Sequence, residues 1–181
     1  MLKRFVSEDE LHRSSDELKL TPCPFCKRIG TLIHHGWLYG YLDTDSSQKT
    51  ARSRRVFCNN RKTRNNGCGH TFTVRAAETL QRSCLKATGL WTFLKDVLEL
   101  SNKAAALRKL DLAASSAYRL WQRFLDGQSR IRSLLNRICP PPDLPDSSCP
   151  AAQTVAHLEA AFGHERCPIV AFQERLQVSF T

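Results

Sequence analysis

Residues 21–74 decide how the first part of this chain folds, and they read TPCPFCKRIGTLIHHGWLYGYLDTDSSQKTARSRRVFCNNRKTRNNGCGHTFTV. Cys23 and Cys26 open the stretch with two residues between them, and Cys58 and Cys68 stand near its end. The short first gap lets both thiols turn toward a single ion, and Zn²⁺ closes a structural site with four such ligands at tetrahedral corners. The pattern therefore predicts a structural zinc site formed by these four cysteines.

The second pair of cysteines leaves alternatives open. Nine residues separate Cys58 from Cys68, where two to four are usual. The residues between them are polar, basic and turn-forming, so we expect an inserted loop whose ends still meet. His70 is an alternative fourth ligand in place of Cys68, and buried or disulfide-linked cysteines are the alternative to a metal site. A weaker candidate for a second metal site consists of Cys139, Cys149, His164 and Cys167.

Positive charge is concentrated in the middle of the chain. The 181 residues carry a net charge of +10. Residues 21–77 hold ten basic and two acidic residues, and residues 78–139 hold eleven basic and five acidic ones, whereas both ends are slightly acidic. A central basic block suits a polyanion, because phosphates neutralised by Lys and Arg release counterions. The alternative is a basic surface that serves only solubility.

The hydrophobic pattern changes from strand-like to helix-like near residue 78. Residues 29–42, 52–57 and 70–74 favour strands, whereas apolar residues in 78–138 recur with a helical period. Residues 167–180 are ambiguous between helix and strand. We therefore expect an α+β chain with an acidic N-terminal segment (1–20), a small β zinc ribbon (21–77), an α-helical domain (78–138), a Pro-rich linker (139–150) and a short C-terminal extension (151–181).

Residues 101–125 have the pattern of a helix-turn-helix, in which a short alanine-rich helix and a tight turn precede a second helix. Small and apolar side chains would close a three-helix core, which leaves short hydroxyls and long donors outward on the second helix. Such side chains reach phosphates and base edges in a major groove. A plain helical bundle is the alternative. The candidate nucleic-acid-binding residues of this helix are Ser115, Ser116, Tyr118, Arg119, Gln122 and Arg123.

A second basic group lies in the ribbon itself. It lies beside the predicted metal site, so we expect it to contact phosphates; its members are Arg52, Arg54, Arg55, Arg61, Lys62 and Arg64. Trp37, Tyr39 and Tyr41 alternate and would share one strand face. A small aromatic core under the zinc is the favoured interpretation of that face, and a surface that stacks on bases is the other.

Three motifs together resemble known ribbons. Cys23-Pro-Phe-Cys26, Arg55-Val-Phe-Cys58 and Cys68-Gly-His-Thr-Phe-Thr-Val74 resemble the transposase-type zinc ribbons of insertion-sequence proteins, and they also look like the Ogr/Delta phage transcription activators. The order of ribbon and helix-turn-helix is closer to the first family, over about residues 20–125. Lys27 departs from the glycine that such knuckles often carry. The resemblance implies a DNA-binding protein of a mobile element or phage.

We therefore expect a zinc-dependent, sequence-specific DNA-binding protein that acts as a transposition accessory factor or transcriptional regulator. Its expected partners are double-stranded DNA, a transposase, recombinase or polymerase, and a second copy of the chain. An RNA-binding or protein-scaffolding ribbon is the alternative. We expect no catalysis, because Asp43 and Asp45 are the only acids of the ribbon and no catalytic motif appears. The absence of a signal peptide and of a long apolar run favours a cytoplasmic, nucleoid-associated protein without a membrane partner.

Overall fold

Strands fill the first part of the chain and helices fill the second, so the fold is α+β with a β-ribbon followed by helices. The computed structural model describes residues 4–5, 10, 13, 15–41, 49–60, 66–100, 103–110, 112–143 and 149–181. The chain divides into two compact units, Met1–Thr79 and Leu80–Thr181. This division falls two residues beyond the boundary between residues 77 and 78 that the sequence pattern predicted.

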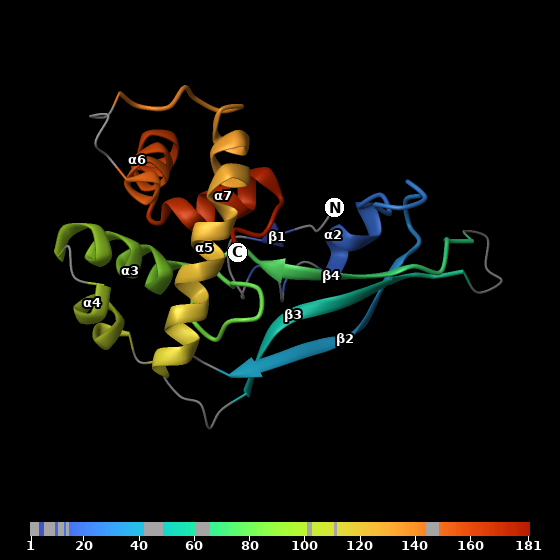
Figure 1. The fold of residues 1–181 in the computed structure, drawn as a ribbon. Helices are drawn as coiled ribbons and strands as arrows, with labels where there is room; N and C mark the ends of the chain where they lie inside the picture. The colour runs from blue at the N-terminus through green and yellow to red at the C-terminus, as the bar shows by residue number, and fades with distance from the viewer. Residues whose placement is uncertain are drawn as a thin grey trace. The chain divides into compact units, whose positions relative to one another are not determined.

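The first unit contains one sheet with the strand order β1-β4-β3-β2. The strands β2 (Leu32–Tyr41), β3 (Lys49–Cys58) and β4 (Thr71–Ala76) pair antiparallel, as Figure 1 shows, and the short β1 (Arg4–Phe5) pairs parallel with β4. The helix α2 (Ser15–Leu20) precedes the first metal knuckle. The sheet thus carries Cys58 at the end of β3, where the strand meets the inserted loop.

The strand β2 is continuous, although its glycines suggested breaks. The pairing with β3 shifts register between His34 and Gly36 and again between Leu38 and Tyr39, and Gly36 has a φ of 123°, which only glycine adopts readily. Trp37 packs on the core of the unit, while Tyr39 and Tyr41 remain 64% and 46% exposed. The predicted aromatic core therefore includes Trp37 alone of the three.

The core of the first unit is small and surrounds the cysteines. Its apolar members come from α2 and the three long strands, namely Leu18, Leu32, Val56 and Val74. Cys23 and Cys58 are fully buried in the same cluster, and Cys26 and Cys68 pack against it. Such a small core favours a bound metal as an additional source of stability.

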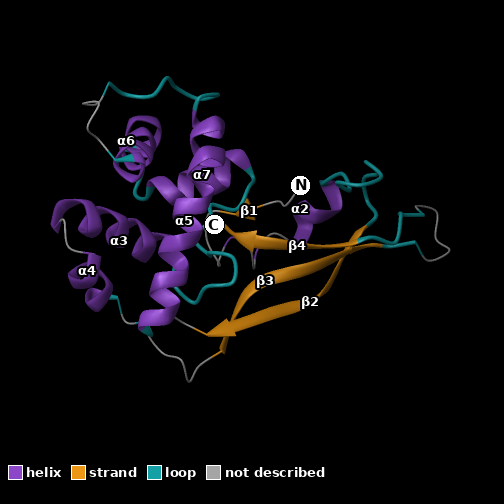
Figure 2. Cartoon of the chain, in the orientation of Figure 1, coloured by secondary structure: helices purple, strands orange, loops and turns teal. Residues whose placement is uncertain are grey.

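The second unit consists of five helices in its described residues (Figure 2). They are α3 (Ala87–Leu100), α4 (Lys103–Lys109), α5 (Ala114–Leu135), α6 (Pro150–Phe162) and α7 (Pro168–Leu176). Both α6 and α7 begin with proline, which fits the first helical position because it lacks the N–H that would be unpaired there. The long α5 packs against α4 and α6, and α7 packs against α3 and α6.

The C-terminal residues belong to the core of the second unit. Phe162, Phe172 and Phe180 are fully buried, and they pack with Phe124 of α5 in one cluster. The segment predicted as an extension is therefore an integral part of the helical unit, and its ambiguous residues 168–176 are helical. The structure thus shows this segment folded on the helical domain.

Two details of the helical region differ from the pattern. Apolar spacing from Leu80 suggested that a helix starts there, but α3 starts only at Ala87, because residues 80–86 form turns in which Arg82 has a φ of 56°. In α4, Ala106 is the buried alanine, whereas Ala104, which the pattern placed in the core, is exposed.

Candidate metal centre and polar helix face

The first knuckle folds around Cys23. The Lys27 N–H donates to the Cys23 carbonyl at 2.9 Å, and the Cys23 N–H donates to the Arg28 carbonyl at 2.9 Å, so the chain returns on itself within six residues. Lys27 takes a φ of 63°, the left-handed conformation that glycine adopts most easily. Its ammonium group donates to the Pro24 carbonyl at 3.0 Å. Lysine thus fills the position of the usual glycine without changing the turn.

The second knuckle closes despite its inserted loop. The Gly67 N–H donates to the Asn59 carbonyl at 2.6 Å and the Gly69 N–H donates to the Cys58 carbonyl at 3.0 Å, so the two ends of the insertion meet as expected. Gly69 has a φ of 76°. A side chain on Gly67 would collide with the Cys58 sulfur and the Asn59 carbonyl. The turn therefore requires glycine beside Cys58.

The four predicted cysteines converge on one point. Their Sγ atoms all lie within 4.8 Å of one another. The Cys23–Cys68 and Cys26–Cys58 sulfur pairs are each 3.7 Å apart, and all four thiols are free. A disulfide would bring two sulfurs to about 2.05 Å. A tetrahedron with metal–sulfur bonds of about 2.3 Å has edges of about 3.8 Å. The spacing therefore fits a metal ion and excludes the disulfide alternative.

The surroundings of the sulfurs favour ionisation at one of them. Burial raises the pKa of Cys23 to about 11. Burial also opposes ionisation of Cys58, but hydrogen bonds from the Thr31 hydroxyl at 3.2 Å and the Cys68 N–H at 3.2 Å outweigh it and lower the pKa to about 7. A cation at the centre would favour the thiolate form of all four ligands. Thr31 is a supporting residue that the sequence pattern did not reveal.

The alternative ligands lie elsewhere. The His70 ring stacks on Phe25 with centroids 4.5 Å apart, so Cys68 is the member of the cluster. His34 is half-buried, and burial followed by the nearby Arg54 lowers its pKa. Across the part of the chain that the structure describes, no other group of three or more ligand side chains gathers. The suggested second site at Cys139, Cys149, His164 and Cys167 is therefore not formed.

The basic residues of the ribbon divide between two faces. Neighbouring residues of β3 point to opposite sides of the sheet. Arg54 lies 4.5 Å from the centre of the Trp37 ring, and its burial lowers its pKa. Arg55 is exposed opposite Gly36, and Arg52 donates to the Tyr41 carbonyl at 3.5 Å. Arg61, Lys62 and Arg64, together with the acids Asp43 and Asp45, lie outside the described residues.

The outward residues of α5 lie as the pattern predicted. Ala117, Leu120, Trp121 and Phe124 are buried, and the other positions between them are exposed or half-buried. The exposed set is Ser115, Ser116, Tyr118, Arg119 and Gln122, and Arg123 is half-buried. The Gln122 amide donates to Asp126 at 3.2 Å. This polar helix face could hydrogen-bond to a polar ligand without disturbing the core.

Arg123 and Arg119 are also tied to the backbone. The Arg123 guanidinium donates to the Gln81 and Arg82 carbonyls, both at 3.4 Å, and thereby links α5 to the turn before α3. The Arg119 Nε–H donates to the Ser115 carbonyl at 3.2 Å. Arg82 and Ser83 face this part of α5, and no sequence signal indicated them because their proximity depends on the tertiary fold.

None of the helices in the described residues is long and apolar enough to cross a membrane. Comparison of the chain with protein-family models, with curated proteins and with solved structures finds no match.

Proposed function

We propose that the chain is a zinc-dependent, sequence-specific DNA-binding protein without catalytic activity. The observation that carries the proposal is the convergence of Cys23, Cys26, Cys58 and Cys68 at metal-ligand spacing within a basic ribbon. Tetrahedral thiolate sites hold zinc or iron. A structural zinc ion would stiffen the knuckles so that the basic side chains of the ribbon keep a fixed position against phosphates.

The helical unit supplies the second part of the proposal. Its α5 presents hydroxyl, amide and guanidinium groups on one exposed face, and such groups hydrogen-bond to base edges in a major groove. The short α4 before α5 fits the order of a helix-turn-helix. The resemblance of the ribbon motifs supports a mobile-element or phage setting, where the protein would assist transposition or regulate transcription. A transposase, recombinase, polymerase or second copy would be its protein partner.

The proposal is tested by selecting duplexes from a random pool with the metal-loaded chain, alongside elemental analysis. We expect about one zinc ion per chain. The Gln122→Ala variant should bind the selected duplex about tenfold less well while its affinity for unrelated duplexes stays unchanged, because only a base contact is lost. Ile138→Ala is the control, since Ile138 lies beyond α5. Equal binding of all duplexes by the unaltered chain would contradict sequence-specific binding. Iron in place of zinc in the elemental analysis would contradict the assignment of the bound ion as zinc.

Tyr39 and Tyr41 favour a second candidate function. Both rings are exposed on the ribbon, and exposed aromatic rings stack on the bases of single-stranded nucleic acid. The second candidate is therefore an RNA-binding ribbon. Competition between duplex DNA and single-stranded RNA at several salt concentrations separates the two. Loss of RNA binding in Tyr39→Ala, with duplex binding retained, would favour the second function.

A further inference from the structure

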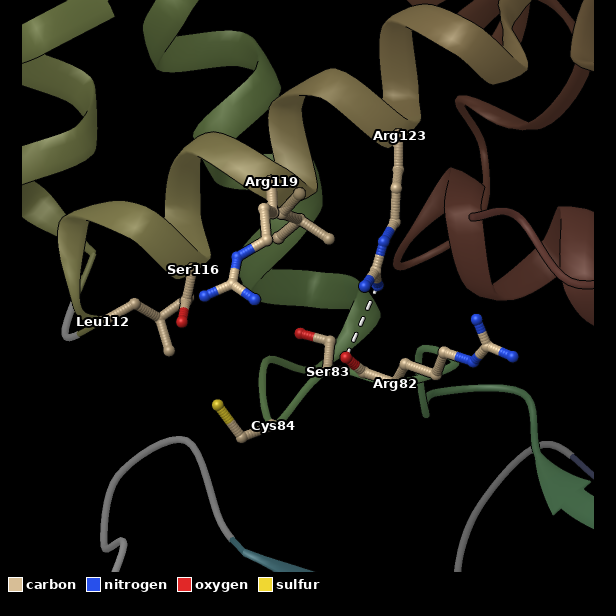
Figure 3. A pocket seen from close by; sticks show the side chains of 8 residues that line it. Arg82, Ser83, Cys84, Leu112, Ser116, Arg119 and Arg123 are labelled. Carbon is tan, nitrogen blue, oxygen red and sulfur yellow. Dashed lines mark hydrogen bonds between the residues drawn. The ribbon is translucent and has the colours of Figure 1, made fainter.

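A small cavity lies within the helical unit where α5 faces the turn at residues 82–84 (Figure 3). Its volume is about 110 Å³. The turn contributes Arg82, Ser83 and Cys84, and the α5 side contributes Leu112, Ser116, Arg119, Leu120 and Arg123. In Figure 3, Arg119 and Arg123 descend from α5 toward the turn, and the Ser116 hydroxyl lies on the same side of the cavity.

The lining of the cavity carries uncompensated positive charge. Three of its residues are arginines and none is acidic. Within the described part of the chain, none of these three guanidinium groups forms an ion pair with a carboxylate. The contact of Arg119 through Nε leaves both of its terminal nitrogens available as donors. The Arg119 and Arg123 guanidinium groups both extend toward the turn (Figure 3) without a carboxylate of the described residues beside them, so they repel one another, and an anion between them relieves that repulsion.

Further features of the cavity fit a small anion. The volume of liquid water per molecule is about 30 Å³, so the space suits a few waters or one tetrahedral oxyanion. Arg82 keeps a φ of 56°, a strained conformation for a residue with a side chain, and strain of this kind concentrates at ligand sites. No acidic residue occurs in the first turn of α5. An acid there would have opposed an anion at this end of the helix.

We propose that this cavity is a phosphate-binding pocket, with Arg119 as the main ligand and Ser116 as a further donor. One guanidinium group can donate two parallel hydrogen bonds to two oxygens of a phosphate, and a hydroxyl can donate a further hydrogen bond from another direction. Arg123 holds the turn in place through its two carbonyl contacts. The pocket assigns Arg119 to phosphate binding and not to base recognition.

The pocket adds a phosphate contact to the proposed DNA binding. It rests on the proposed function only for the source of the phosphate. If the chain binds duplex DNA, the occupant is a backbone phosphodiester that anchors α5 independently of sequence. If it does not, the same donors hold a free phosphate group. The two cases share one chemistry, and they are separated by using inorganic phosphate and duplex DNA as distinct probes.

The first experiment titrates the full, metal-loaded chain with inorganic phosphate and follows the arginine Nε–H signals by NMR, with chloride at equal ionic strength as reference. We expect a saturable shift in the Arg119 signal. Arg119→Gln should weaken phosphate binding at least tenfold, whereas Arg137→Gln, which removes the same charge from an exposed residue beyond α5, should leave it unchanged. Equal shifts with chloride, or equal weakening in both variants, would overturn the pocket.

The second experiment measures Arg119→Gln against several duplexes. We expect about tenfold weaker binding to every duplex and a salt slope smaller by about 1, as for the loss of one phosphate contact. A changed ranking of duplexes would mean that Arg119 reads bases, and would overturn its assignment. Phosphate binding without any duplex binding would refute the proposed function while supporting the pocket with a free phosphate as occupant.

Discussion

At the scale of single residues, we expect the candidate metal centre to depend on a hydroxyl group that is not itself a ligand. Thr31 is 2% exposed, and its hydroxyl lies 3.2 Å from the Cys58 sulfur. We expect Thr31→Val, which keeps the shape but removes the donor, to weaken metal binding about 10–100-fold, as the loss of an outer partner typically does. Competition with a chromophoric chelator measures the change. Thr31→Ser, which keeps the hydroxyl, should retain the affinity; equal loss in both variants would contradict the role of this hydrogen bond.

Gly67 is a second residue on which the centre depends. A Cβ at this position would meet the Cys58 sulfur, and the nearby backbone of Asn59 leaves no room to move aside. We expect Gly67→Ala to displace Cys58 and to reduce the metal content of the purified chain by more than half, because a displaced sulfur cannot complete the tetrahedron. Gly127→Ala in α5 is the control, since its Cβ would make only ordinary contacts, the nearest at 3.6 Å. Full metal content in Gly67→Ala would show that the knuckle tolerates a shift.

The ligands themselves could be predicted from the sequence, whereas their supports could not. Cysteine spacing is a local signal, and it identified all four members of the cluster. Thr31 reaches Cys58 only because β2 and β3 pair with Leu32 opposite Cys58. The same applies to Arg82 and Ser83, which line one cavity with Arg119 although almost forty residues of chain separate them. Contacts of this kind depend on register and packing, which no local pattern contains.

At the scale of elements, the C-terminal segment completes the helical unit. Phe180 is fully buried, stacks on Phe124 with centroids 6.1 Å apart, and meets Phe172 edge-on at 5.5 Å. Its N–H donates to the buried Gln173 side chain at 3.0 Å. Removal of a buried phenylalanine leaves a cavity and loses its transfer free energy. The last residues of the chain are therefore as important for the core as the helices before them.

We expect Phe180→Ala to lower the free energy of unfolding of the helical unit by about 3–5 kcal/mol. Urea unfolding followed by circular dichroism measures the change. The control is Ile138→Ala, because Ile138 is 41% exposed and should alter the stability by less than about 1 kcal/mol. A similar small change in both variants would show that the C-terminal residues are dispensable for this core.

Helices could be predicted where the regular repeat of apolar residues continues over a long run of sequence, and could not be predicted where that run is short. The amphipathic pattern indicated helices through residues 87–135, whereas position 150, which the pattern assigned to the linker, is the first residue of α6. The run from 168 to 176 is apolar on most sides because α7 is buried between other helices, so its period could not distinguish helix from strand. Residues 80–86 kept apolar spacing yet form turns, since Leu80 and Leu85 reach the core without a helix.

At the scale of the whole molecule, the two units rely on different sources of stability. Among the described residues, the core of the helical unit contains twenty-two buried residues, ten of them between Ala151 and Phe180. The ribbon core has six, two of which are cysteines of the metal cluster. Burial of apolar surface stabilises the first kind of core directly. We expect the second kind to depend on an ion at its four cysteines, because metal binding and the folding of a small unit are coupled.

Removal of the metal should therefore unfold residues 1–79 and leave residues 80–181 folded. All described helices except α2 and the residues just before it lie in the second unit, so chelation at neutral pH should preserve most of the ellipticity at 222 nm. In NMR spectra, the amide signals of β2, β3 and β4 should collapse to random-coil positions, and those of α3–α7 should keep theirs. Added zinc should restore the strand signals, because metal binding and folding of a small unit are one equilibrium. Strand signals that survive complete chelation would show that the ribbon folds without metal, and loss of the helical signals would show that the two units unfold together.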